Sequence, residues 1–219
     1  MWRYEIKVAL QPYEVITFRS WLASAVDFSR HFPSRFIHSI YLDNQDYGAA
    51  KDNIDGLGNR MKARIRWYDQ SNNNARLEAK IKQDRLGRKI VSSADISVIK
   101  FLELNTNERI KFLSNIDVFN DSISNFKLFH PTIGVHYRRE YYISLNKQVR
   151  MTVDSEISFE DIISKSASKT ASGKIIVEFK FSPTSNHYVS HLFENFPFYP
   201  TKNSKYVLGL SMLGRAIYL

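Results

Sequence analysis

In the stretch RMKARIRWY, residues 60–68, basic and apolar side chains alternate strictly from Arg60 to Trp67. A period of two predicts a β-strand with one charged face and one apolar face. The apolar face needs cover from another element, and the charged face is either solvated or built to hold an anion. The basic side chains of this stretch are Arg60, Lys62, Arg64 and Arg66.

Similar alternation elsewhere predicts about eight strands in all. The strands expected at 60–69 and 75–84 are joined by the polar loop QSNNN, which indicates a hairpin. The remaining strands are expected at 3–10, 35–44, 87–93, 132–144, 148–158 and 174–182.

Helical spacing of apolar residues predicts several helices between these strands. They are expected at 12–25, 185–196 and 204–219, with a short helix or turn at 45–56 and two or three short helices between 95 and 127. The polar segment 164–173 is expected to be a loop. Short connections between most strands indicate an antiparallel α+β fold, and we expect a single domain over residues 1–219.

The composition favours a polyanionic partner. The 219 residues include 31 Lys and Arg against 22 Asp and Glu, which gives a formal charge of +9. The absence of cysteine excludes disulfides and thiolate metal sites. No stretch approaches the roughly 20 apolar residues of a membrane span, so we expect a soluble, cytoplasmic protein.

A Glu-x-Lys unit recurs on three expected strands, at residues 5–7, 78–80 and 178–180. An antiparallel sheet of about eight strands can close into a barrel. With the charged faces inward, the lumen would hold many cations and few glutamates, which a phosphate chain and a divalent metal ion would balance. The alternative is a set of ordinary strands with solvated outer faces, and composition and spacing leave both interpretations open.

Several segments together resemble a known family. They are RYEIK (3–7), SIYLDNQDYGAAKDNIDG (39–56), KARIRWYD (62–69), LEAKIKQDRLGRK (77–89), HYRREYY (136–142), VRMTVDSEI (149–157), VEFKF (177–181) and NSKYVLGL (203–210). The chain is similar in these segments to the polyphosphate polymerase domain of the vacuolar transporter chaperone (VTC) family, which belongs to the triphosphate tunnel metalloenzymes, related to the CYTH phosphatases. At 219 residues it resembles the stand-alone catalytic core of bacterial relatives.

The resemblance implies an eight-stranded antiparallel β-barrel with flanking helices, through which a triphosphate tunnel runs. It also implies Mn²⁺ or Mg²⁺ as cofactor, with Glu178 as the chief metal ligand and Glu5 and Glu78 as helpers. Catalytic roles fall to Arg64, Arg66, Lys80, Arg139, Arg150 and Lys205. Phosphate or nucleotide binding is expected of Lys7, Lys89, Lys180 and Ser204. Lys62, from the stretch RMKARIRWY, is added to this group.

In the family's chemistry, the γ-phosphate of ATP passes to a growing polyphosphate chain. A triphosphatase acting on inorganic or nucleoside triphosphate in the same tunnel is the first alternative, because only the acceptor differs. A non-catalytic module that binds polyphosphate or another polyanion is the second. The expected partners are ATP and polyphosphate, or inorganic triphosphate, without specific nucleic acid. A membrane-protein partner for product export would place the chain at the inner face of a membrane.

Overall fold

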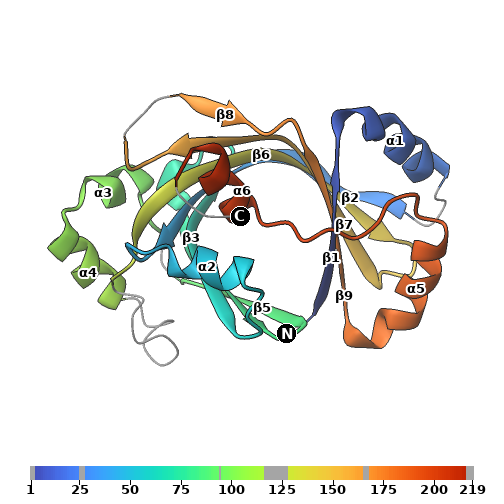
Figure 1. Ribbon diagram of the computed structural model, residues 1–219, viewed down its shortest axis with the longest axis horizontal. Coiled ribbons are helices and arrows are strands. Elements are labelled where there is room, and N and C mark those ends of the chain that lie inside the picture. The colour runs from blue at the N-terminus through green and yellow to red at the C-terminus, as the bar shows by residue number, and fades with distance from the viewer. Residues whose placement is uncertain (1–2, 25–27, 94, 116–127, 165–167, 216–219) are drawn as a thin grey trace.

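The computed structural model describes residues 3–24, 28–93, 95–115, 128–164 and 168–215 and shows one strongly curled antiparallel sheet with helices around it (Figure 1). The predicted α+β class and the eight-stranded antiparallel sheet are confirmed. The strands follow one another across the sheet in the order β1 (Tyr4–Leu10), β9 (Ile175–Phe181), β7 (Val149–Asp161), β6 (His130–Ser144), β2 (Phe28–Asp43), β3 (Arg60–Tyr68), β4 (Arg76–Gln83) and β5 (Leu86–Val91).

The sequence alternation assigns each strand an outer, apolar face and an inner, largely charged face. On β3, the fully buried Ala63 and Ile65 belong to the outer hydrophobic cluster, whereas Arg64 and Arg66 lie on the opposite face. Strands with this pattern must curl if the charged faces are to come together inside and the apolar faces are to be covered outside.

Helices cover the outer apolar face in two separate places (Figure 1). α1 (Val15–Ser24) and α5 (Asn186–Glu194) supply Phe18 and Val189 to a cluster with β1, β9 and β7. At the other side of the molecule, α3 (Val98–Glu103) and α4 (Thr106–Ser114) supply Phe101 and Leu113 to a cluster with β2, β3 and β4.

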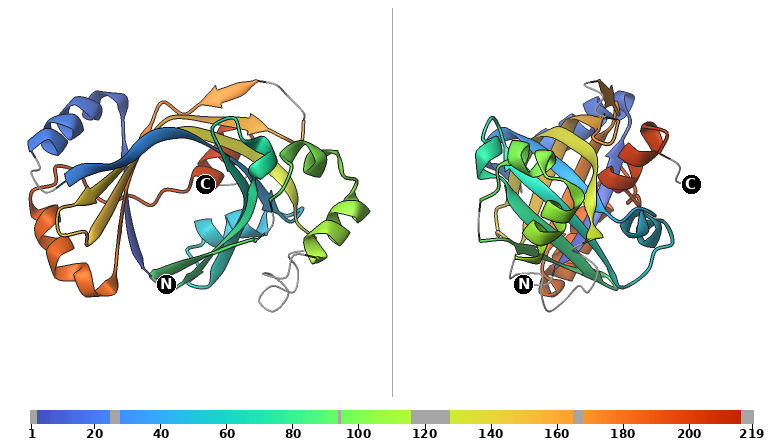
Figure 2. Two further views of the ribbon diagram at one scale, coloured as in Figure 1. Left: turned by 180° about the vertical axis from the view of Figure 1, so that it is seen from behind. Right: turned by 90° about the vertical axis from the view of Figure 1, so that its left-hand side faces the viewer.

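A third cluster lies on the inner face, at one end of the curl. There, α6 (Lys205–Met212) packs Tyr206 and Leu210 against β6 and β7, beside α2 (Gly48–Ile54). Gly209 allows this close approach, because a Cβ at this position would lie 2.6 Å from side-chain carbons of both Ile133 and Phe159. One end of the curl is therefore occupied by α6, with α2 beside it (Figures 1 and 2).

The two edge strands of the sheet meet at one point. Backbone hydrogen bonds in both directions join Arg3 and Gly87, which form an isolated antiparallel bridge between the two edges. Farther along β1, its free edge is covered by the segment before α6, because the Thr201 amide donates to the Lys7 carbonyl at 2.7 Å and the Ala9 amide donates to the Thr201 hydroxyl at 3.0 Å. The curl thus closes partly through strand pairing and partly through this segment.

Three expectations about the elements are corrected. β2 begins at Phe28, seven residues before the predicted strand, because its first half pairs with β6. The prediction of a loop at 164–173 is partly wrong, since the short strand β8 (Lys169–Ala171) pairs with β7 there. The closing helix ends at Met212, and a turn with Gly214 at φ +65° follows.

The helix expected at 12–25 begins with the 3-10 turn η1 (Pro12–Glu14). The helical prediction for 116–127 lies outside the described residues. Two further 3-10 turns, η2 (Asn72–Asn74) and η5 (Pro183–Ser185), occur at strand ends. No helix in the described part of the chain is long and apolar enough to cross a membrane.

Candidate functional site

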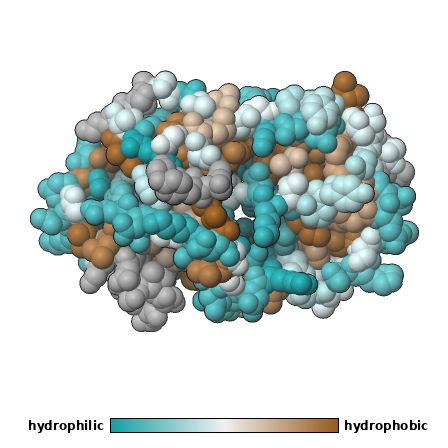
Figure 3. Space-filling model, in the orientation of Figure 1, coloured by the Kyte–Doolittle hydropathy of each residue, from teal (hydrophilic) through white to brown (hydrophobic). Residues whose placement is uncertain are grey.

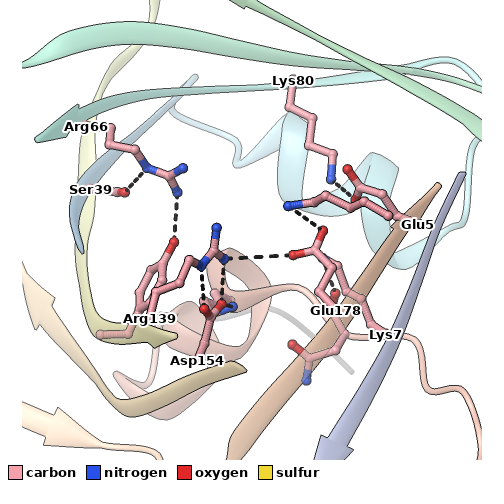
Figure 4. A network of polar contacts seen from close by, with 12 residues as sticks. Glu5, Lys7, Ser39, Arg66, Lys80, Arg139, Asp154 and Glu178 are labelled. Carbon is pink, nitrogen blue, oxygen red and sulfur yellow. Dashed lines mark hydrogen bonds and ion pairs between the residues drawn. The ribbon is translucent and has the colours of Figure 1, made fainter. Parts of the chain in front are cut away.

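The inner face of the curled sheet gathers most of the basic residues predicted from the sequence (Figure 4). Cross-strand register places Lys7 opposite Glu178 and Arg64 opposite Glu78. In the space-filling view, hydrophilic residues border a narrow hollow near the centre of the face shown (Figure 3). We call the following thirteen side chains the inner network: Glu5, Lys7, Lys62, Arg64, Arg66, Glu78, Lys80, Lys89, Arg139, Asp154, Glu178, Lys180 and Lys205.

On one wall, Glu178 lies at the centre of the cations. Its carboxylate is 3.4 Å from Lys180 Nζ and 3.9 Å from an Arg139 nitrogen, and Glu5 lies diagonally across from it on β1, opposite Lys180. Burial opposes the charge on Glu178, but Lys180 and Lys7 outweigh it and hold the pKa of this carboxyl well below its usual value. Burial in turn lowers the pKa of Lys180 to about 8, although Glu178 favours its charged form.

Asp154 belongs to the same wall and was not among the predicted site residues. It is fully buried and binds Arg139 through two hydrogen bonds of 2.5 and 2.7 Å, while Lys205 Nζ donates to it at 2.6 Å. Burial disfavours its charge, but Arg139 and Lys205 lower the pKa of Asp154 to about 2. The sequence does contain an indication, because Asp154 alternates with the outward Val153 and Met151 on a strand that also contains Arg150.

On the opposite wall, Glu78 is held by three cations. Its carboxylate is 2.8 Å from Arg64, 3.5 Å from Arg66 and 2.7 Å from Lys89. Burial disfavours the charge, yet these cations hold the pKa of Glu78 well below its usual value. This wall also holds three polar partners that sequence reasoning missed, because Arg64 donates to Tyr41 and Arg66 donates to Ser39 and Tyr137.

On the same three strands, β3, β4 and β5, lysines face one another across the strands. Lys80 lies opposite Lys62 on β3 and opposite Lys89 on β5. Lys62 Nζ donates to the Ser204 hydroxyl at 2.7 Å, and Lys80 forms an ion pair with Glu5. Burial, with Lys7 and Lys80 nearby, lowers the pKa of Lys62 well below its usual value.

The inner network has a large excess of positive charge. It contains nine basic side chains and four carboxylates, and every carboxylate has at least one basic partner. Opposed like charges on neighbouring strands are destabilising unless something lies between them. An extended anion with several charged oxygens would relieve that repulsion, and arginine and lysine side chains are suited to phosphate.

The three predicted metal ligands do not come together. In the described residues, no group of three or more His, Asp or Glu side chains is placed to hold a metal ion. Glu5 and Glu178 are neighbours on one wall, whereas Glu78 is held by its arginines on the other. Mg²⁺ is commonly bound by one or two carboxylates and completed by substrate phosphate oxygens, so a pair such as Glu178 and Glu5 has the donor chemistry for it. The assignment of Glu178, Glu5 and Glu78 as metal ligands stays a prediction.

Arg150 is the one predicted catalytic cation that lies apart from the inner network. Its Cα pairs in register with Lys180 and its side chain follows the inner parity of β7, but the residue is exposed. It is the second residue of β7 and follows the turn that joins β6 to β7. The other predicted cations, and Ser204 through Lys62, meet at the inner surface.

Sequence comparison agrees with this arrangement. The model of the VTC domain family matches residues 2–214. No curated protein sequence matches the chain.

Several solved structures share the fold. A proposed adenylyl cyclase from Hippeastrum, described as having a dominant triphosphatase activity, has a TM-score of 0.60 at 16% identity over 95% of each chain. A proposed adenylate cyclase from Vibrio parahaemolyticus has a TM-score of 0.51 at 10% identity, covering 94% of this chain and 98% of the other. The PH1819 protein from Pyrococcus horikoshii has a TM-score of 0.50 at 16% identity, covering 95% and 99%. Such low identities show the fold alone.

Proposed function

Because the chain belongs to the VTC domain family, we propose that it transfers the γ-phosphate of ATP to a growing polyphosphate chain inside the curled sheet. The observation that supports this most is the excess of basic over acidic side chains on the inner face. Phosphoryl transfer depends on positioning and on stabilising negative charge far more than on covalent help from the protein. The inner network supplies donors for both purposes.

In this proposal, Arg64, Arg66 and Arg139 bind phosphate oxygens through their planar guanidinium groups. Their present partners are carboxylates and tyrosine hydroxyls, so the guanidinium groups are already oriented before an anion enters. Catalytic roles also go to Lys80 and Lys205, and Arg150 would guide anions at the exposed end of β7. Phosphate binding is assigned to Lys7, Lys62, Lys89, Lys180 and Ser204.

The divalent metal ion, Mn²⁺ or Mg²⁺, would be held by Glu178 with Glu5. Bound there with phosphate oxygens, it would neutralise charge and act as a Lewis acid. The protein needs no general base for this transfer, since the terminal phosphate of the acceptor is already ionised. The tightly held Asp154 instead keeps Arg139 and Lys205 in position.

A triphosphatase is the second candidate, because no side chain of the inner network distinguishes a phosphate acceptor from water. The described triphosphatase activity of the Hippeastrum protein, which shares the fold, also makes this candidate worth testing. A module that only binds polyphosphate would use the same cations without turnover.

The deciding experiment incubates the purified protein with ATP and Mn²⁺, stops the reaction with chelator and records phosphorus NMR spectra. A growing resonance of interior chain phosphates supports the polymerase, and orthophosphate alone supports the triphosphatase. Glu178→Gln should abolish either activity while leaving much of the tripolyphosphate affinity. Glu194→Gln, at an exposed glutamate on α5, is the matched control and should retain full activity. Absence of both products with the wild-type protein would refute both enzymatic proposals and favour the binding module.

A further inference from the structure

Thr152 is buried on the inner face without a hydrogen-bond partner. It lies in β7, is 6% exposed, and its hydroxyl oxygen makes no hydrogen bond within the part of the chain that the structure describes. Buried hydroxyl groups in folded proteins nearly always have a partner, so an orphan of this kind calls for an explanation.

The position of Thr152 in β7 shows which groups lie around its hydroxyl. It alternates with the outward Met151 and Val153, and its cross-strand neighbour on β9 is Glu178. The residue two positions along β7 is Asp154, which holds Arg139. The orphan hydroxyl therefore lies on the wall of the inner network, beside the carboxylate proposed to hold the metal ion.

The surrounding charges indicate which ligand this hydroxyl would meet. Lys180 and Arg139 both approach Glu178 next to it, so the positive excess of the inner network extends to this point. A threonine hydroxyl can donate one hydrogen bond, and a phosphate oxygen is a strong acceptor. A hydroxyl kept free of protein partners can donate to such an oxygen without first breaking another bond.

We propose that Thr152 is a phosphate-binding residue, whose hydroxyl donates to an oxygen of the bound triphosphate or polyphosphate beside Glu178. The inference rests on the proposed function, because it requires the inner face to bind a phosphate chain. It adds a second neutral hydrogen-bond donor, besides Ser204, to a site built mainly from charges, and it predicts that affinity depends on this donor.

Two substitutions separate a ligand role from a structural role. Thr152→Val removes the hydroxyl and keeps the branched shape, and Thr152→Ser keeps the hydroxyl. Titration calorimetry with inorganic tripolyphosphate in chelator-containing buffer should show about ten-fold weaker binding for Thr152→Val, the loss expected for one hydrogen bond to a charged acceptor. Thr152→Ser should bind within about two-fold of the wild type. Because the hydroxyl has no partner in the free protein, the unfolding temperature of Thr152→Val should be unchanged or higher.

Thr132→Val is the matched stability control, because that buried hydroxyl donates to the Tyr41 carbonyl and contacts the Tyr206 hydroxyl. Thr132→Val should lower the unfolding temperature. A similar decrease in Thr152→Val would overturn the inference, since it would reveal a structural partner. Unchanged tripolyphosphate affinity in Thr152→Val would overturn it while leaving the proposed function intact. Absence of binding by the wild-type protein would refute both.

Discussion

Replacement of Asp154 by asparagine should strongly destabilise the free protein. The carboxylate is fully buried and holds Arg139 through two hydrogen bonds and Lys205 through a third. Asp154→Asn keeps the shape but removes the charge, which leaves two buried cations opposed by less negative charge. Breaking a buried ion pair in this way typically costs about 3–5 kcal/mol.

The pKa of Asp154 gives a second value for the stability that this carboxylate contributes. Lowering the pKa of Asp154 from 3.8 to about 2 corresponds to about 2 kcal/mol of stability at neutral pH. Because the folded-state pKa lies below the unfolded-state value, this contribution is present above about pH 4 and is lost as the pH falls towards 2. For a chain of this length, a loss of 2–5 kcal/mol lowers the unfolding temperature by on the order of 10 °C.

The assay is urea unfolding of the wild type and Asp154→Asn at pH 7 and again near pH 3. We expect the difference in the free energy of unfolding to be largest at pH 7 and to shrink in acid. Asp95→Asn is the matched control, because its pair with Arg76 is about half exposed on both sides and should contribute less than about 1 kcal/mol. If Asp154→Asn costs no more than the control at pH 7, the assignment of Asp154 as the holder of these cations is refuted.

Three further changes test other parts of the structure. Because burial lowers the pKa of Lys180 to about 8, its charge is lost as the pH rises through that value. Tripolyphosphate affinity measured by calorimetry should therefore fall between pH 7 and pH 9, and Lys180→Arg should flatten this dependence. Equal wild-type affinities at both pH values would contradict the phosphate-binding role of Lys180. Arg64→Ala should weaken tripolyphosphate binding at least about ten-fold, because a buried bidentate donor is lost, and equal calorimetric affinities would count against an anion site on β3. Gly209→Ala should lower the free energy of unfolding in urea by about 1–3 kcal/mol, because the new Cβ would clash with Ile133 and Phe159. Ser211→Ala on the same helix should be nearly neutral. Equal losses of unfolding free energy in the two variants would refute the close packing of α6.

The inner and outer faces were predictable because a strand alternates with a period of two. Lys62, Arg64 and Arg66 lie on the inner face for the same reason that Ala63 and Ile65 lie outside. Composition and spacing allow the charged face to point either inward or to solvent, and the family resemblance favours the inward orientation. The structure confirms that orientation for these strands.

Other features depend on contacts that no local pattern contains. The first half of β2 has little alternation and includes Pro33, yet it forms a strand because β6 offers it a partner. Glu78 resembles Glu178 in its local Glu-x-Lys motif, but its cross-strand partner is Arg64, and only the register reveals that it is occupied by guanidinium groups. Arg150 has the inner parity of β7 but is exposed, and spacing in the sequence does not reveal how far a side chain is covered.

The same logic explains why Asp154, Tyr41 and Tyr137 were missed. Each acts as a partner of a basic residue from another strand, so its role exists only after the sheet has curled. Some of the basic residues, such as Lys62, Arg64 and Arg66, stand out by their regular spacing, and the others are implied by the family resemblance. Their partners occur singly.

The closure of the sheet has a consequence for the order in which the protein assembles on the ribosome. β1 is made first, but its partner strand β9 begins at Ile175, and the Ala9 amide reaches the Thr201 hydroxyl across 192 positions of sequence. Until β9 has been made, β1 lacks the strand that it pairs with in register, and its backbone contact with the part of the sheet made before then is the bridge between Arg3 and Gly87. Contacts of such long range make folding slow. The proposed phosphate-binding surface can be completed only after β9 and the segment before α6 have emerged.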